Sequence, residues 1–281
     1  MIECIDVTRR YGHAEVLCGV NLTLREPGVY CLLGRNGAGK TTLLRSIAGR
    51  QRLTAGSVRV DGREVTPGSL APDVSYVENF AGHYNLPVRK LLSVAGDLCP
   101  GYDRDFAAEM VQRFELDGRK RFRQLSLGMK TMLSTAICLA SGWSAALLDE
   151  PVLGFDAIMR LEFYDMLTES IRRHPRILVV STHLIEEIAD AVHHLIVLDR
   201  GSVRFFEPME AVRRCAFCVS GLRADVEAAS AGQRVLSQQD VGDLATACIF
   251  GEPPAGDGVE VRPLTLQELF VCLVGGKGGA R

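Results

Sequence analysis

The chain has 281 residues, enough for one large domain or two small ones with a substantial core. Its 32 Lys and Arg residues against 34 Asp and Glu residues give a formal charge of −2. No summed positive field therefore favours nucleic acid or an anionic membrane surface as a partner. The first thirty residues mix charged and apolar positions and have the pattern of neither a signal peptide nor a transit sequence.

The cysteines favour a reduced, cytoplasmic protein. There are nine, an odd number, and most stand inside apolar runs, where a free cysteine behaves as a small hydrophobic residue. We expect all nine to be reduced. Cys215 and Cys218 form a C-x-x-C pair, but no second pair or histidine partner stands at zinc-ligand spacing, so chance spacing is the favoured interpretation.

The first predicted elements are strands. Segments with period-2 alternation at residues 2–24 and 56–65 predict an antiparallel layer, with Asp61-Gly62 as a hairpin turn signal. An apolar run at 29–33 predicts a buried strand, followed by a helix that starts near Lys40. From about residue 86 to 140 the apolar period becomes helical.

Three compact apolar runs then follow, at 145–148, 177–180 and 195–198, and they are typical of buried parallel strands. The longest apolar stretch, 131–148, contains several Ser and Thr residues, and we interpret it as a buried helix and a strand rather than a membrane span. Asp156 is the expected N-cap of a helix that ends at Pro175. The fold class predicted is α/β, mainly parallel, with a helical insertion and a small C-terminal α/β appendage.

Residues 34–41 read Gly-Arg-Asn-Gly-Ala-Gly-Lys-Thr and satisfy the phosphate-binding spacing G-x-x-x-x-G-K-[ST]. The glycines let backbone N–H groups curl toward one anion at a helix N-terminus. Lys40 would neutralise β- and γ-phosphate oxygens, and the Thr41 hydroxyl would bind Mg²⁺. A glycine-rich turn alone would not need Lys-Thr in register. The motif predicts a P-loop NTPase core whose nucleotide-binding residues are Gly34, Asn36, Gly37, Ala38, Gly39, Lys40, Thr41 and Thr42.

Two further strand ends carry polar side chains. Asp149 and Glu150 directly follow the run at 145–148, at the sheet edge where ligands bind in open α/β sheets. Asp149 can hold Mg²⁺ or its water, while Glu150 suits a general base that orients and deprotonates the attacking water. An acidic strand end that meets solvent is the structural alternative. His183 follows the run at 177–180 and could bond a γ-phosphate oxygen, although a lone histidine there is more often structural.

Residues 125–130, Leu-Ser-Leu-Gly-Met-Lys, stand just before the buried helix. Ser126 there is an ordinary N-cap, yet its hydroxyl and the free helix N–H groups would also make a second γ-phosphate site. In order and spacing, these elements together resemble the nucleotide-binding subunit of an ABC transporter over about residues 2–205. The resemblance implies an ATPase domain at 1–206 with a helical insertion at about 84–140, and a C-terminal accessory region at 207–281.

The resemblance also implies roles for single residues. Tyr11 would stack on adenine, Ser126 and Gly128 would contact the ATP held by a partner protomer, and Asp156 would lie at that dimer seam. In this sequence Leu127 and Met129 replace a glycine and a glutamine of the family signature, and residues 151–156 depart conservatively from the family pattern.

Glu78 stands where the family has a glutamine that links Mg²⁺ and water to the membrane partner. A glutamate can still offer Mg²⁺ an oxygen, so we count Glu78 with Thr41 and Asp149 as a predicted metal ligand. It also adds a negative charge near the phosphates. A like-charge contact at 4 Å is worth about 4 kcal/mol at an effective dielectric constant of 20. We therefore expect an unusually strong Mg²⁺ dependence of ATP binding.

The family mechanism implies an ATP- and Mg²⁺-dependent ATP hydrolase, with two ATPase subunits, as a homodimer or a heterodimer, sandwiching two ATP molecules. Separate integral membrane permease subunits would carry the solute, and this subunit would lie at the inner face of the cell membrane. Residues 181–190 and 264–270 resemble the ABC-2 branch that includes antibiotic exporters, so outward transport is expected. The alternatives are a soluble ABC ATPase acting on ribosomes or DNA, and an unrelated P-loop kinase or GTPase.

Overall fold

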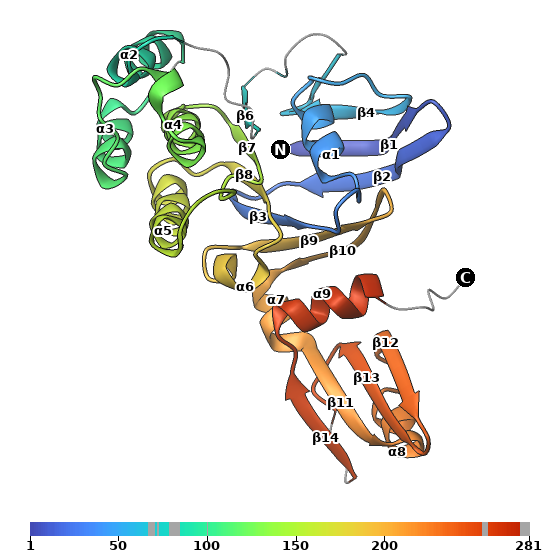
Figure 1. Ribbon diagram of the computed structural model, residues 1–281. Coiled ribbons are helices and arrows are strands. Elements are labelled where there is room, and N and C mark those ends of the chain that lie inside the picture. The colour runs from blue at the N-terminus through green and yellow to red at the C-terminus, as the bar shows by residue number, and fades with distance from the viewer. Residues whose placement is uncertain (67–70, 72, 79–84, 100, 255–257, 276–281) are drawn as a thin grey trace.

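A six-stranded sheet forms the centre of the computed structural model, which describes residues 1–66, 71, 73–78, 85–99, 101–254 and 258–275 (Figure 1). Its order is β10-β9-β3-β8-β7-β6, with every neighbouring pair parallel except β10 and β9. The strands are β3 (Gly28–Leu33), β6 (Val74–Val77), β7 (Ala145–Asp149), β8 (Ile177–Ser181), β9 (His194–Asp199) and β10 (Ser202–Pro208). Every residue of β3, β7 and β8 is buried, which explains their continuous apolar runs.

An antiparallel sheet lies beside this central sheet, as the alternating segments predicted. Its order is β2-β1-β4-β5, from β1 (Ile2–Tyr11), β2 (Ala14–Leu24), β4 (Ala55–Val60) and β5 (Arg63–Glu64). Asp61 and Gly62 form the predicted turn between β4 and β5, both with positive φ. Helix α1 (Lys40–Ile47) shares one hydrophobic cluster with both sheets, so the helix after the P-loop is held firmly in place.

Helices cover the opposite face of the central sheet (Figure 1). They are α2 (Val88–Leu98), α3 (Arg104–Arg113), α4 (Leu127–Ala140) and α5 (Ala157–Arg173), with a short 3₁₀ helix at Phe122–Gln124. Phe106, Met110 and Phe114, which recur at spacings of four within the region predicted as helical, are all buried there. The stretch 131–148 forms most of α4 and then β7, as expected. Within the described residues, no helix is long and apolar enough to cross a membrane.

The C-terminal residues form a third sheet, in the region predicted as a small α/β appendage. Its order is β12-β13-β11-β14 and all its pairs are antiparallel, from β11 (Ala216–Leu222), β12 (Arg234–Val241), β13 (Leu244–Phe250) and β14 (Val259–Pro263). Helix α8 (Arg223–Ala229) covers one face. Short helices α6 (Ile185–Ile188) and α7 (Met209–Cys215) precede this sheet.

The last helix, α9 (Leu266–Gly275), turns back toward the ATPase core and contacts α6 and β9 (Figure 1). Leu269 is buried in the hydrophobic cluster that also holds β3, β7 and β8. The predicted boundary at 206/207 falls inside β10. The start of the predicted helical insertion, at residue 84, lies outside the described residues.

The expectation that all nine cysteines are reduced was wrong for one pair. Cys248 on β13 and Cys272 on α9 form a disulfide across a sequence separation of 24 residues. Sequence spacing could not reveal this pairing, because it depends on α9 folding back over the sheet. The other seven cysteines are free thiols, including Cys215 and Cys218 of the C-x-x-C pair.

Candidate nucleotide-binding site

The P-loop connects β3 to α1, so it begins where a fully buried strand ends and closes at a helix N-terminus. Gly39 has φ 107° and a Cβ there would lie 2.8 Å from the carbonyl oxygen of Val16, so only glycine fits. Gly37 has φ 82°, and a Cβ there would meet nothing within 4 Å. Gly37 therefore belongs to the open side of the loop, and its lack of a side chain leaves room for a phosphate close to the backbone.

Lys40 is buried, with 8% of its surface exposed. Its Nζ donates to the Gly34 carbonyl oxygen at 2.8 Å and lies 3.6 Å from Glu150 Oε1. The ammonium group thus sits between the loop backbone and the end of β7. Thr41 and Thr42 begin α1 and are half-buried, Asn36 is exposed, and Ala38 is buried. All the predicted P-loop residues therefore lie on the loop after β3 and the first turn of α1.

Asp149 ends β7 and is almost fully buried, and its carboxylate is hydrogen-bonded within the protein. Ser181 Oγ donates to Asp149 Oδ1 at 2.6 Å and accepts from the backbone N–H of Glu150 at 2.9 Å. The hydroxyl of Tyr76 lies 3.5 Å from Asp149 Oδ2. Burial, with help from the charges of Asp149 and Glu78, raises the pKa of Tyr76, so its hydroxyl remains a donor. Sequence reasoning missed Ser181, although it precedes Thr182-His183 at the end of β8.

Glu150 and His183 meet at the same sheet edge. The ring Nδ1 of His183 lies 2.8 Å from Glu150 Oε2. Glu150 also has φ 49°, a left-handed conformation that is uncommon for a glutamate. Because strands β7 and β8 are parallel neighbours, their carboxyl ends carry Glu150 and His183 to adjacent positions. Lys40, Glu150 and His183 therefore form one connected polar cluster.

Glu78 follows β6 and faces a cation that the sequence reasoning overlooked. Arg45 Nε on α1 donates to Glu78 Oε2 at 2.9 Å, and the hydroxyl of Tyr76 donates to the same oxygen at 3.0 Å. The expected negative charge of Glu78 is therefore largely balanced by Arg45. Arg45 stands four residues after Thr41 and so lies one helical turn further along α1, a spacing that could have suggested it.

The residues assigned to a partner's nucleotide form a second group. Ser126 caps α4 by accepting from the Met129 N–H at 3.2 Å, and Asp156 caps α5 by accepting from the Met159 N–H at 2.9 Å. Gly128 is buried, and a Cβ there would lie 3.1 Å from the Gly154 carbonyl oxygen. The start of α4 thus adjoins the loop that leads into α5, on the helical face of the sheet. The N-caps were readable from the sequence, but this close approach was not.

Tyr11 ends β1 and is 47% exposed. The guanidinium carbon of Arg9 lies 4.4 Å from its ring centroid, so one face of the ring already carries a cation. Tyr11 pairs with Ala14 across the β1–β2 hairpin, close in the chain to Val16, which touches the P-loop at Gly39. This placement leaves Tyr11 near one end of the P-loop region.

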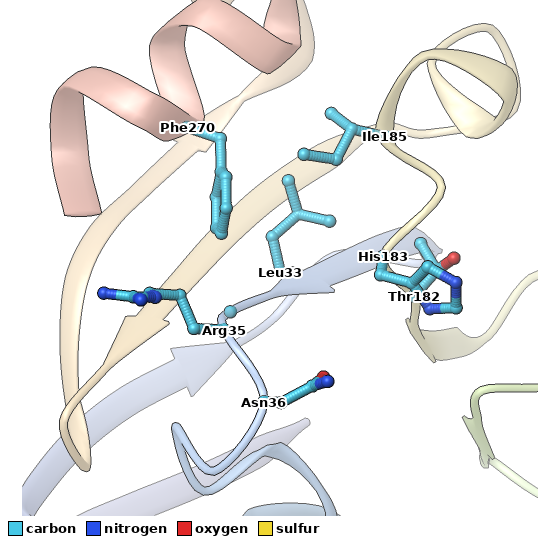
Figure 2. Close-up of a pocket in the computed structure, with 8 residues that line it drawn as sticks. Leu33, Arg35, Asn36, Thr182, His183, Ile185 and Phe270 are labelled. Atoms are coloured by element: carbon cyan, nitrogen blue, oxygen red, sulfur yellow. The ribbon is translucent and has the colours of Figure 1, made fainter. Parts of the chain in front are cut away.

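A cavity of about 400 Å³ adjoins the P-loop (Figure 2). Figure 2 shows Phe270 reaching from α9 toward Leu33 and Arg35, with His183 and Ile185 approaching from the segment after β8. Sequence reasoning did not place any residue of the C-terminal region at this site. The full lining comprises Leu33, Gly34, Arg35, Asn36, Thr182, His183, Ile185 and Phe270.

Comparisons with known proteins agree with this geometry. Residues 17–153 match the family model described as "ABC transporter". The chain is 26% identical over 291 residues to the ABC transporter ATP-binding protein YtrB of Bacillus subtilis, and the match covers 99% of both chains. It is 32% identical over 206 residues to the daunorubicin resistance ATP-binding protein DrrA3 of Streptomyces coeruleorubidus, covering 69% of this chain and 64% of that one.

The solved structure of an ATP-binding subunit of an ABC transporter superposes with a TM-score of 0.67 at 22% identity, covering 76% of this chain and 92% of that chain. This likeness supports the α/β P-loop fold. The family match covers the P-loop, β7 and Glu150, and it agrees with the family that the residue pattern predicted. The chain belongs to the ABC transporter family, as one of its ATP-binding, ATP-hydrolysing subunits.

Proposed function

We propose that the chain hydrolyses ATP at the cluster of Lys40, Glu150 and His183 and that this hydrolysis drives export through separate membrane subunits. The proposal depends on two contacts of one carboxylate. Glu150 Oε1 lies 3.6 Å from Lys40 Nζ of the P-loop, and Glu150 Oε2 lies 2.8 Å from Nδ1 of His183. A cation for the phosphates, an acceptor for a water proton and a polar orienting group are the three groups that phosphoanhydride hydrolysis needs.

The residues around the P-loop fit a Mg²⁺-bound triphosphate. Gly37 opens onto free space, the loop backbone can present its N–H groups there, and Lys40 is held toward the loop by Gly34. Thr41 and Asp149 would hold the Mg²⁺, with Glu78 beside them. Bound Mg²⁺ would neutralise charge on the phosphate oxygens. A site of one or two carboxylates plus substrate phosphates is the usual protein contribution to Mg²⁺ binding.

In the proposed reaction Glu150 accepts a proton from the attacking water. The ionised carboxylate is the form that can accept a proton, and Lys40 Nζ lies 3.6 Å from its Oε1. His183 holds the carboxylate through Nδ1 and, as a polar group at the same edge, orients the water and a terminal phosphate oxygen. Ser181 keeps Asp149 and the backbone of Glu150 in register.

We further propose that two such subunits associate head to tail around two ATP molecules. Ser126 and Gly128 of one subunit would contact the nucleotide on its partner, and Asp156 would lie at the seam. Their adjacency at the starts of α4 and α5 supports this division of labour. Tyr11 would stack on the adenine ring. The exposed Leu127 and Leu153, 52% and 47% accessible, lie beside these residues and would be covered in such a dimer.

The transported solute would pass through integral membrane permease subunits, with this subunit at the cytoplasmic face. The relative named for daunorubicin resistance supports outward transport, because removing a compound from the cell protects against it. The comparisons lend no support to an ATPase acting on ribosomes or DNA, which was the alternative from the sequence.

Copurification tests the transport assignment. The full chain, tagged and expressed in its native cells, should bring down a polytopic membrane protein from mild-detergent extracts. Its ATPase activity should be inhibited by competing ATP analogues more strongly than by GTP analogues. Recovery of ribosomes or DNA in place of a membrane protein would contradict the transport function, and a preference for GTP would contradict the ATPase assignment.

A further inference from the structure

The C-terminal helix α9 contributes an aromatic side chain to the cavity beside the P-loop. Phe270 is half-buried and lines that cavity with Arg35 and Asn36 of the P-loop and with Thr182 and His183 (Figure 2). An aromatic ring from the accessory region therefore lies next to the group that contacts Glu150. We propose that Phe270 is a positioning residue for ATP hydrolysis, which holds the segment of His183 against the P-loop.

The segment that carries His183 follows β8, and α9 contacts it at two positions. Ile185, two residues after His183, lines the same cavity as Phe270, and both pack against one hydrophobic cluster together with Leu33. The backbone N–H of Gln267 donates to Glu186 Oε1 at 2.9 Å. Helix α9 thus touches the two residues that open α6, immediately beyond His183. The position of the imidazole depends on where that short helix is held.

Helix α9 is itself fixed at its beginning. Thr265 and Glu268 form a capping box: Thr265 Oγ1 accepts from the Glu268 N–H at 3.2 Å, and Glu268 Oε2 accepts from the Thr265 N–H at 3.0 Å. Arg262 on β14 donates two hydrogen bonds to the same carboxylate, at 2.7 and 2.9 Å. The helix start is therefore locked to the C-terminal sheet.

The other attachments of α9 lie along its length. Cys272 is bonded to Cys248 of the C-terminal sheet, and Leu269 is buried in the core of the ATPase sheet. Phe270 stands between these two anchors, so its ring has a defined place rather than a mobile one. A rigid support of this kind matters because misplacement of a reacting group by about 1 Å can lower a rate by about 10²-fold.

The inference rests on the proposed function, and it predicts a split between turnover and binding. Phe270→Ala removes the ring from the cavity but leaves Lys40 and the P-loop in place. We expect turnover to fall by about 10-fold, while the dissociation constant for Mg·ATP changes by less than about 2-fold. Phe270→Leu, which keeps an apolar side chain of similar reach, should restore most of the turnover. Val271→Ala is the matched control, because Val271 is the next residue of α9 and is 55% exposed.

Hydrogen exchange provides a readout that does not depend on activity. In the nucleotide-free full chain, Phe270→Ala should speed amide exchange in residues 182–188 relative to the wild type, whereas Val271→Ala should leave it unchanged. Unaltered exchange in that segment, or turnover of Phe270→Ala within about 2-fold of wild type, would overturn the inference. A wild-type chain that fails to hydrolyse ATP would instead refute the proposed function, so the two failures are distinguishable. If Phe270→Ala does not fold, Phe270→Val, which also withdraws the side chain from the cavity, replaces it in both assays. Slower turnover and faster exchange are then expected for Phe270→Val, whereas Phe270→Leu and Val271→Ala should stay close to the wild type.

Discussion

The imidazole Nδ1 of His183 lies 2.8 Å from the carboxylate Oε2 of Glu150, and this contact links two strands of the central sheet at the P-loop. A hydrogen bond to one ring nitrogen leaves the other ring nitrogen to act on a ligand. Oε1 of the same carboxylate is 3.6 Å from Lys40 Nζ. The pair thus joins the proposed base to the proposed phosphate-binding cation.

Glu150→Gln keeps the size of the side chain and removes its capacity to accept a water proton. We expect normal ATP binding, accumulation of an ATP-bound dimer and a loss of turnover of about 10²-fold or more. Steady-state phosphate release and size-exclusion chromatography with Mg·ATP measure both outcomes. Near-normal hydrolysis in this variant would remove Glu150 as the base.

Lys40→Ala removes a buried ammonium group that faces the loop where phosphates are proposed to bind. We expect the dissociation constant for ATP to rise by about 10²-fold, equivalent to about 2.7 kcal/mol. Equilibrium binding of a fluorescent ATP analogue measures this change. Lys90→Ala, at an exposed position of α2, is the control and should bind as the wild type does. Retained affinity in Lys40→Ala would count against the P-loop assignment.

Arg45→Met removes the cation 2.9 Å from Glu78 and leaves the Glu78 carboxylate unbalanced near the phosphate site. We expect the Mg²⁺ concentration for half-maximal ATP binding to rise by roughly tenfold, which corresponds to about 1.4 kcal/mol. The double variant Arg45→Met/Glu78→Gln should return to the wild-type requirement, and Glu78→Gln alone, which leaves Arg45 as an unbalanced cation, should lower it. If Arg45→Met needs the same Mg²⁺ concentration as the wild type, the charge of Glu78 does not affect nucleotide binding.

The contact between Glu268 and Arg262 should make the attachment of α9 to the C-terminal sheet sensitive to acid. Hydrogen bonds from Arg262, followed by the Thr265 backbone N–H, lower the pKa of Glu268 from its ordinary value near 4.5 to about 2. Because the folded-state pKa is the lower one, the stabilisation is fully present above about pH 4.5 and is lost as the pH falls toward 2.

Hydrogen exchange of residues 264–275 between pH 6 and pH 3, corrected for intrinsic rates, measures this effect. Protection should decline with acid in the wild type. Glu268→Gln should show a weaker pH dependence, whereas Glu260→Gln, at an exposed position on β14, should behave as the wild type. Equal pH dependence in all three proteins would show that the Arg262–Glu268 contact does not hold α9.

Arg176 has a buried guanidinium group, and its hydrogen bonds go to backbone carbonyls and a serine hydroxyl rather than to a carboxylate. It donates to Leu139 O at 2.5 Å, to Ser170 Oγ at 2.9 Å and to Ser141 O, and burial lowers its pKa. Arg176→Met would remove a buried donor from each of these acceptors, so we expect a loss of about 3 kcal/mol in the free energy of unfolding. Urea denaturation measures it. Arg172→Met, at an exposed position with 75% of the side chain accessible, should leave the denaturation midpoint close to that of the wild type.

The sequence alone determined four of the six strands of the central sheet and the position of the candidate site. The apolar runs that became β3, β7, β8 and β9 needed no tertiary information, because a parallel strand covered on both faces is apolar along its whole length. The P-loop spacing and the caps at Ser126 and Asp156 depend on local backbone conformation, so they too were readable. These local rules located the P-loop and the two caps, whereas Tyr11 and Gly128 were assigned through the resemblance to the ABC transporter family.

Only the tertiary structure decided which groups from distant segments share an environment. Arg45 balances Glu78, Ser181 holds Asp149, and Phe270 enters the P-loop cavity, although 33, 32 and more than two hundred residues separate the partners in the chain. The Cys248–Cys272 bond and the antiparallel C-terminal sheet belong to the same class. Side-chain pairing across such separations is set by how sheets and helices pack, and no local propensity encodes it.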